Sequence, residues 1–340
     1  MPGKKIVTIG GGTGSFTVLS GLKNTDFDIS AIVSMIDDGG STGRLRDELG
    51  VLPPGDVRQC LVALSEESKA MRDIFNYRFD SGGLKGHSLG NLFISALEKK
   101  YGSFVKGLEV AMKILNIKGK IIPASTSDTK LFLEFKNGDI LKGENEIYES
   151  GNLKRKKITK LYLKPKAQAN EKAIEAINEA DLIVICPGNL YCSLVPGFLP
   201  SGMAEAIEKA KGKVVYIANL VNKKGQTDDF TVEDYVAVLN DCIGSDRIDY
   251  VLYNAAKPEK ELEKKYKEEG ETLVELANKE NRSYKLVEAD LLNNKTEKRS
   301  NADALAARRS LIRHDSQKVA RVVEYLANME EYQNLIKKIR

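Results

Sequence analysis

The feature that most constrains the fold of this 340-residue chain is a set of six short runs that are apolar at almost every position. They are KIVTIG (5–10), ISAIVSM (29–35), DLIVICPG (181–188), KVVYIAN (213–219), DYVLYN (249–254) and SYKLVEAD (283–290). Such runs are typical of strands that are covered on both faces. Helical patterns separate them, and each run is followed by a Gly, Asn or Asp turn. The sequence therefore predicts an α/β fold with a doubly wound, Rossmann-like and mostly parallel sheet.

The pattern changes between residues 120 and 168. In this region KLFLEFKNGDILKGENEIYES (130–150) and KITKLYLKPK (157–166) alternate apolar and polar residues around an Asn-Gly-Asp turn. Alternation around such a turn indicates antiparallel hairpins. We therefore expect one domain over residues 1–340, with a β-hairpin insertion at 120–168 between two α/β halves.

Composition and the chain's N-terminal segment argue against several classes of protein. Lys and Arg number 52 against 48 Asp and Glu, so the net charge of +4 gives no global polyanion-binding field, and we predict no nucleic-acid partner. The four cysteines have neither metal-ligand nor disulfide-framework spacing, which favours a reducing compartment. No run has the length of a bilayer span, and the first residues lack the apolar stretch of a signal peptide. We expect a cytoplasmic protein without membrane insertion.

A glycine-rich loop follows the first apolar run. It consists of Gly10, Gly11, Gly12, Thr13 and Gly14. Glycines let the backbone turn sharply and approach a ligand, and the N-terminus of the next helix, expected near Ser15, favours an anion. The spacing matches neither the dinucleotide-binding motif nor the P-loop, so a purely structural turn is the alternative.

The segment SMIDDGGSTGRLRDELG (34–50) mixes acidic and basic side chains directly after the second apolar run. Because parallel strands end at one edge of a sheet, this segment is expected beside the glycine loop. Asp37 and Asp38 can accept from a sugar hydroxyl, bind Mg²⁺ or act as a base, and Arg44 and Arg46 can pair with phosphate. The alternative is that Arg46 pairs with a neighbouring acidic residue on a solvated helix.

Two further loops are predicted to reach the same edge. In LPPGDVRQCLVAL (52–64), Asp56 is expected to cap a helix whose Arg58 can still face the crevice. In KGHSLGNLFISAL (85–97), His87 lies shortly before Asn91, at the start of an apolar helix. An acid/base role and a structural role for His87 are both open.

Seven motifs occur in an order that resembles one protein family. They are IGGGTG, DDGGSTGRLR, LPPGDVRQCLVALS, GHSLGN, PGNLYCSLVP, GQTDDFTVEDYV and RHD, and the resemblance runs from about Lys4 to Ala320. The chain resembles the bacterial gluconeogenesis-factor family (YvcK-like), a branch of the larger family that includes 2-phospho-L-lactate transferase (CofD-like). The resemblance implies a three-layer α/β/α fold, a cytoplasmic location, binding of UDP-sugars such as UDP-N-acetylglucosamine, and a role in cell shape and growth on gluconeogenic carbon sources.

The resemblance also implies a nucleotide-sugar site. Its predicted contacts are Gly10, Gly11, Gly12, Thr13, Gly14, Asp38, Ser41, Thr42, Arg44, Arg46, Asp56, Asn91, Gly188, Asn189, Tyr191, Ser193, Asn219, Thr227, Asp228, Asn254, Tyr266 and Arg313. Tyr266 is expected to hold the nucleotide by stacking or through its hydroxyl, and Arg313 by pairing with phosphate. If a reaction occurs, its candidate catalytic residues are Asp37, Asp38 and His87, with Mg²⁺ at the two aspartates. Ser316 lies where relatives carry a phosphorylatable Thr, and its phosphorylation is a further expectation.

Three functions follow from these observations. The first, which we favour, is a nucleotide-sugar sensor that changes its contacts with wall-synthesis or metabolic proteins. The second is a Mg²⁺-dependent phospho-transferase related to 2-phospho-L-lactate transferase. The third is a nucleic-acid or membrane adaptor acting through the basic run NLKRKKITKLYLKPK (152–166), which we interpret instead as a solvated edge strand. The amphipathic C-terminal segment 322–340 is expected to pack on the sheet or to form a homodimer.

Overall fold

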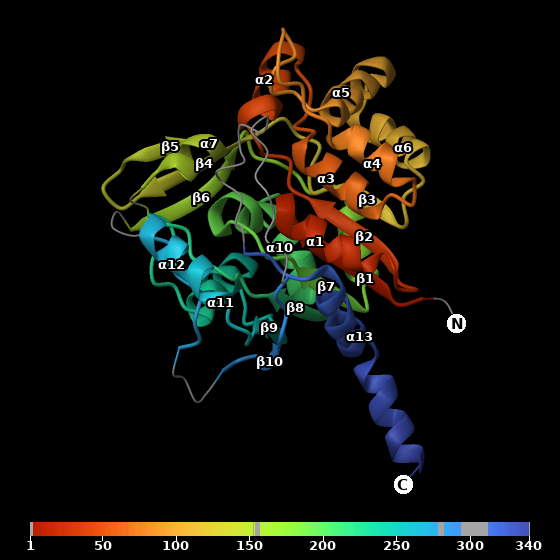
Figure 1. Ribbon diagram of the computed structural model, residues 1–340, viewed down its shortest axis with the longest axis vertical. Coiled ribbons are helices and arrows are strands. Elements are labelled where there is room, and N and C mark those ends of the chain that lie inside the picture. Colours follow the sequence, from red (N-terminus) through yellow and green to blue (C-terminus); the bar gives the residue numbers. More distant parts are fainter. Residues whose placement is uncertain (1–2, 152, 154–156, 278–281, 294–311, 340) are drawn as a thin grey trace.

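The computed structural model describes residues 3–339 except 152, 154–156, 278–281 and 294–311 (Figure 1). Its centre is a seven-stranded sheet in which all neighbours are parallel. In spatial order the strands are β10 (Lys285–Ala289), β9 (Tyr250–Asn254), β8 (Lys213–Ile217), β7 (Leu182–Ile185), β1 (Lys5–Gly10), β2 (Asp28–Val33) and β3 (Lys120–Pro123). Each of the six predicted apolar runs forms one of these strands, so the predicted parallel sheet is confirmed.

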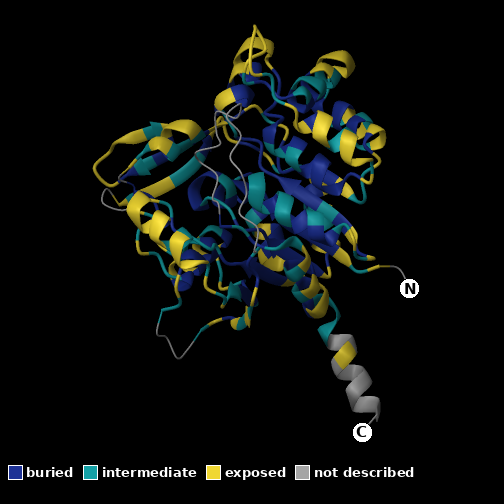
Figure 2. Ribbon diagram, viewed as in Figure 1, coloured by how far each residue is buried: buried dark blue, intermediate teal, exposed yellow. Residues whose placement is uncertain are grey.

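Helices cover both faces of this sheet because successive strand residues point to opposite sides. On β1, Ile6 packs into one core cluster and Val7 into the other, and both side chains are buried. The Ile6 face is covered by α1 (Gly12–Leu22), α3 (Gly55–Leu64), α4 (Lys69–Asn76), α5 (Leu89–Tyr101), α6 (Phe104–Ile114) and α13 (Ser316–Ile339). The Val7 face is covered by α9 (Glu171–Glu179), α10 (Met203–Lys209), α11 (Val232–Ile243) and the helical turns η1 (Leu190–Leu194) and η2 (Val195–Gly197). Figure 2 shows the buried sheet between exposed outer helix surfaces, and the three-layer α/β/α architecture is confirmed.

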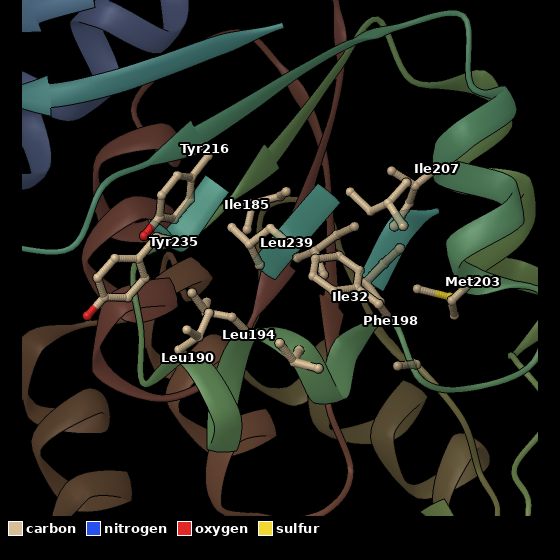
Figure 3. Close-up of a cluster of buried hydrophobic side chains, with 14 of the residues drawn as sticks. Ile32, Ile185, Leu190, Leu194, Phe198, Met203, Ile207, Tyr216, Tyr235 and Leu239 are labelled. Carbon is tan, nitrogen blue, oxygen red and sulfur yellow. The ribbon is translucent and has the colours of Figure 1, made fainter. Parts of the chain in front are cut away.

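The core on the Val7 face extends to the edge where the strands end. Figure 3 shows Ile32 and Ile185 from neighbouring parts of the sheet packed with Leu194 and Leu239. Tyr216 and Tyr235 lie side by side in the same cluster, with ring centroids 6.4 Å apart. The hydroxyl groups of these two tyrosines lie where the apolar core meets the polar residues of the site described below.

A second, smaller sheet lies to one side of the main sheet (Figure 1). It is antiparallel, in the order β5 (Ile140–Lys142), β4 (Lys130–Phe135) and β6 (Ile158–Lys164), and α7 (Glu144–Glu149) follows β5. The hairpins therefore lie within the range predicted for the insertion. Residues 120–123, at the start of that range, belong instead to the main sheet, because β3 pairs with β2 in the parallel sheet. Strand β6 is an edge strand, as predicted for the described part of the basic run.

The remaining helices lie at the ends of the sheet. They are α2 (Gly40–Leu49), between the β2 end and α3, and α12 (Lys260–Glu269), between β9 and β10. The first half of α13 packs on α1, with Val319 and Val323 buried, whereas its C-terminal end extends away from the body (Figure 1). None of the helices in the described ranges is long and apolar enough to cross a bilayer.

Candidate functional site

The strand order reverses direction at β1. Strands β2 and β3 lie on one side of it and β7 to β10 on the other, so the crevice beyond the carboxyl ends of β1 and β7 is the position where open α/β sheets bind ligands. The glycine loop leaves β1 here and meets the loop that follows β7. A Cβ atom on Gly14 would lie 1.7 Å from the Pro187 carbonyl oxygen, so only glycine permits this contact.

A cavity of about 440 Å³ occupies the crevice, and the N-terminus of α1 forms one wall of it. Helix α1 begins at Gly12, earlier than expected from the sequence, and Gly11 precedes it with no side-chain cap. Gly12 has a φ of +64°, a backbone conformation that residues other than glycine rarely adopt. The first-turn amides and the helix dipole at this wall favour an anionic group.

Two residues that the sequence singled out form another wall. Tyr266 on α12 and Arg313, just before α13, both line the cavity. The Tyr266 side chain is 3% exposed, and its hydroxyl accepts a hydrogen bond from the Ile312 amide at 3.1 Å. The Asn293 amide donates to the Arg313 carbonyl at 2.9 Å, which ties this segment to the chain after β10. The fold therefore brings Tyr266 and Arg313 to the glycine loop.

The loops after β7 and β8 complete the cavity. Four residues that are expected to contact the nucleotide sugar line it, namely Gly188, Asn189, Ser193 and Asn219. The Asn219 side-chain amide donates to the Gly188 carbonyl at 2.7 Å, and the Asn189 amide donates to the Gln226 side chain at 2.6 Å. Both asparagines thus hold the loops in shape while lining the site.

Charged side chains that the sequence did not indicate also line the cavity. They are Lys223, Lys224, Glu269 and Glu271, and the aromatic Tyr148 joins them from α7. The Lys223 ammonium lies 2.8 Å from Glu271 and 5.2 Å from the centre of the Tyr148 ring. Burial lowers the pKa of Lys223, but hydrogen bonding and charge from Glu271 and Tyr148 raise it more, so the ammonium stays charged.

A second cavity of about 140 Å³ adjoins the first, sharing Gly12, Thr13, Tyr148 and Ser193. Its polar lining contains Asp37, Ser41, Thr42, Asp56, Arg58, Arg78, Asn91 and Glu144. Asn91 accepts a hydrogen bond from Arg58 at 2.9 Å. Asp56 lies in the first turn of α3, and its side chain is next to Gly11 of the glycine loop. The prediction that Asp56 caps α3 is wrong, because Pro54 occupies the cap position and makes no side-chain cap.

Two carboxyl groups face each other in the second cavity. Asp37 and Glu144 are hydrogen-bonded, and the pKa of each is raised, first by burial and then, for Glu144, by the charge of Asp37. Two hydrogen-bonded, buried carboxylates repel each other when both are ionised, which favours protonation of the pair. Glu144 comes from the insertion, more than a hundred residues after Asp37, and no local sequence signal indicates the pair.

Other predicted site residues contact protein groups outside the two cavities. Asp38 accepts a hydrogen bond from the Asn145 amide at 2.8 Å, at the start of α7. Arg46 is buried and pairs with Asp128, so its alternative pairing on a solvated helix is wrong. The exposed Arg44 donates to the Lys85 carbonyl at 2.9 Å.

The remaining predicted site residues do not line either cavity. His87 is buried, its Nδ1 lies 2.9 Å from the Ser41 hydroxyl, and burial and the charge of Arg44 lower its pKa. Also outside the cavity linings are Gly10, Tyr191, Thr227, Asp228, Asn254 and, at the start of α13, Ser316.

Asp37 and Asp38 thus have different partners and do not form a ready Mg²⁺ site. Among the described residues, no group of three or more His, Cys, Asp or Glu side chains is arranged to hold a metal ion. Mg²⁺ at these two aspartates stays a prediction.

Known proteins share this sequence and architecture. A family model described as 2-phospho-L-lactate transferase CofD matches residues 6–292. The gluconeogenesis factor of Bacillus subtilis is 37% identical over 318 residues, which are 93% of this chain and 96% of that protein. The gluconeogenesis factor of Halalkalibacterium halodurans is 41% identical over 277 residues, or 81% and 85% of the two chains. A crystal structure of a Bacillus halodurans protein is 36% identical, with a TM-score of 0.85 over 94% of this chain and 99% of that one. The chain therefore belongs to the 2-phospho-L-lactate transferase CofD family, in its gluconeogenesis-factor branch.

Proposed function

We propose that this protein binds a uridine nucleotide sugar, such as UDP-N-acetylglucosamine, and is a cytoplasmic regulator of cell shape and growth on gluconeogenic carbon sources. The bound state would be passed to wall-synthesis or metabolic protein partners. The observation that carries the proposal is the cavity at the strand-order reversal, which is lined by the uncapped α1 N-terminus together with Arg313 and Tyr266. A helix N-terminus and a guanidinium together suit a diphosphate, and a tyrosine suits a base or ribose.

The adjoining second cavity suits the sugar. Ser41, Thr42 and Asn91 offer hydroxyl and amide groups there, and Asp37 offers a carboxyl group. A ligand that extends from the first cavity into the second would pass between Thr13 and Tyr148, which line both.

A transferase is the second candidate. The hydrogen-bonded pair of Asp37 and Glu144 favours it, because carboxyl groups with raised pKa values are suited to proton transfer. In that case an acceptor hydroxyl would lie in the second cavity, and Mg²⁺ would assist at the phosphates, as in a phospho-transferase related to 2-phospho-L-lactate transferase.

Calorimetric titration tests the proposal. UDP-N-acetylglucosamine is titrated into the full chain, with GDP and GTP for comparison, and into Arg313→Ala. Arg321→Ala is the matched control, because Arg321 is exposed on α13. We expect saturable UDP-sugar binding to the full chain and unchanged binding to the control. Binding to Arg313→Ala should be weakened at least about tenfold, because one hydrogen bond to a charged group is lost.

The same samples separate the two candidates. Incubation with UDP-N-acetylglucosamine and Mg²⁺, followed by chromatography, should return the sugar nucleotide intact. Guanine-nucleotide binding that needs Mg²⁺, without any response to UDP-sugars, would contradict the regulator and favour the transferase.

A further inference from the structure

The small antiparallel sheet has an outer face that the nucleotide site does not use. Its inner face packs Leu131, Leu133 and Leu163 into the hydrophobic core. Side chains alternate along the strands, so the register places a second set of residues on the outer face. These pairs are Lys130 opposite Lys164, Phe132 opposite Tyr162 and Lys142, and Glu134 opposite Lys160.

We call this outer surface the basic–aromatic face and define it as Lys130, Phe132, Lys142, Lys160, Tyr162 and Lys164. All four lysines are exposed. Phe132 and Tyr162 are half-buried, and their rings stack with centroids 5.6 Å apart. Neither ring belongs to the core clusters of the described part of the chain. Ile140, opposite Glu134 at the margin of the face, is 43% exposed.

One pairing on this face works against stability. Lys130 and Lys164 lie directly opposite each other across β4 and β6, and like charges in this position are destabilising. With four lysines and the single acidic residue Glu134 in the paired rows, the face carries a local excess of positive charge. A positively charged rim around a half-buried aromatic pair is complementary in charge to an acidic partner.

We propose that the basic–aromatic face is the docking surface for an acidic segment of a protein partner. The lysines supply charge complementarity, and the Phe132–Tyr162 stack with Ile140 supplies an apolar centre for side chains of that segment.

The aromatic geometry favours a protein over single-stranded nucleic acid. Nucleic-acid platforms present aromatic faces on which bases stack. Here Tyr162 stacks on Phe132, and the Lys160 ammonium lies 5.1 Å from the Tyr162 ring centre. These neighbours make the Tyr162 ring less open to a base, whereas a carboxylate only has to meet the lysines at the rim.

The test measures fluorescence anisotropy of a labelled oligoglutamate peptide, the probe for the acidic partner, with the full chain. Lys164→Glu is compared with Lys113→Glu, an equal charge change at an exposed position of α6. We expect saturable peptide binding that weakens with added salt, falls about fivefold or more in Lys164→Glu, and changes less than about twofold in Lys113→Glu.

Thermal unfolding of the same variants guards against misfolding. Lys164→Glu replaces the repulsion from Lys130 with attraction, so its unfolding midpoint should equal or exceed that of the wild type while peptide binding is lost. Labelled oligo(dT) is the second probe. Tighter binding of oligo(dT) than of the peptide, equal losses in both variants, or no saturable peptide binding at low salt would overturn the proposal.

Discussion

Replacing Gly14 with Ala tests the contact on which the site is built. The added Cβ would lie 1.7 Å from the Pro187 carbonyl oxygen and 2.7 Å from its carbonyl carbon. Contacts of a Cβ under 3.0 Å do not persist, so the two loops must separate by about 1.3 Å, the difference between 3.0 and 1.7 Å. Both sides of the contact are backbone, so no side chain can rotate away. Overpacking of this kind costs about 1–3 kcal/mol of the free energy of unfolding.

The same substitution moves two walls of the larger cavity apart. The first turn of α1 and the loop after β7 both line that cavity, so a phosphate cannot contact both at once after the shift. Losing one hydrogen bond to a charged group costs about 1.5–3 kcal/mol, which weakens binding by about 10- to 150-fold. Gly14→Ala should therefore lower both stability and affinity for UDP-N-acetylglucosamine.

Urea unfolding and calorimetric titration measure the two effects. Gly83→Ala is the control, because a Cβ there meets no atom within 4 Å and its φ is not positive. Its free energy of unfolding should match the wild type or rise by less than about 1 kcal/mol. A Gly14→Ala protein with wild-type stability and affinity would refute the close approach and its role in binding.

Three further substitutions give distinct outcomes. Asp38→Ala removes the acceptor for the Asn145 amide and should lower the free energy of unfolding by about 0.5–2 kcal/mol in urea titrations. Glu144→Gln addresses the raised carboxyl pKa values: wild-type stability should fall as the pH rises from the usual carboxyl range through the raised values, because the unfolded chain releases these protons first. The variant removes the repulsion with Asp37, so urea midpoints should show a flatter pH profile and a gain confined to higher pH. Tyr266→Phe leaves a buried amide without its acceptor and should cost about 1–3 kcal/mol, measured by thermal unfolding.

The main sheet could be predicted from the sequence because buried parallel strands leave an almost continuous apolar signal. The strand β3 could not be assigned in the same way. The strand has only four residues, KIIP, and Pro123 ends the apolar run before any turn signal. The segment that follows β3 has a clearer alternation of apolar and polar residues, and residues 120–123 are therefore included in the predicted insertion.

The site could be predicted only in part, for a different reason. Glycines at a strand end indicate a ligand loop wherever the chain goes next, and the loop from Gly11 to Gly14 does line the cavity. For a charged residue, the sequence does not show toward which part of the fold the side chain points. Asp37 and Asp38 are neighbours in the sequence, yet one lines a cavity and the other bonds to α7. Tyr148 joins the site through packing of the insertion, which no local pattern encodes.

Helix α7 connects the two functions proposed for this protein. Tyr148 on α7 lines both cavities, while Ile147 beside it packs with Leu131 and Leu133 under the basic–aromatic face. A ligand that shifts α7 must therefore act on the sheet that carries that face. Binding linkage is reciprocal, so UDP-N-acetylglucosamine must change the affinity for the acidic peptide by the same factor by which the peptide changes the affinity for UDP-N-acetylglucosamine. A common factor different from one would show that the two sites are coupled, as the position of α7 between them predicts, whereas a factor of one would assign the face to a partner that does not respond to the nucleotide sugar.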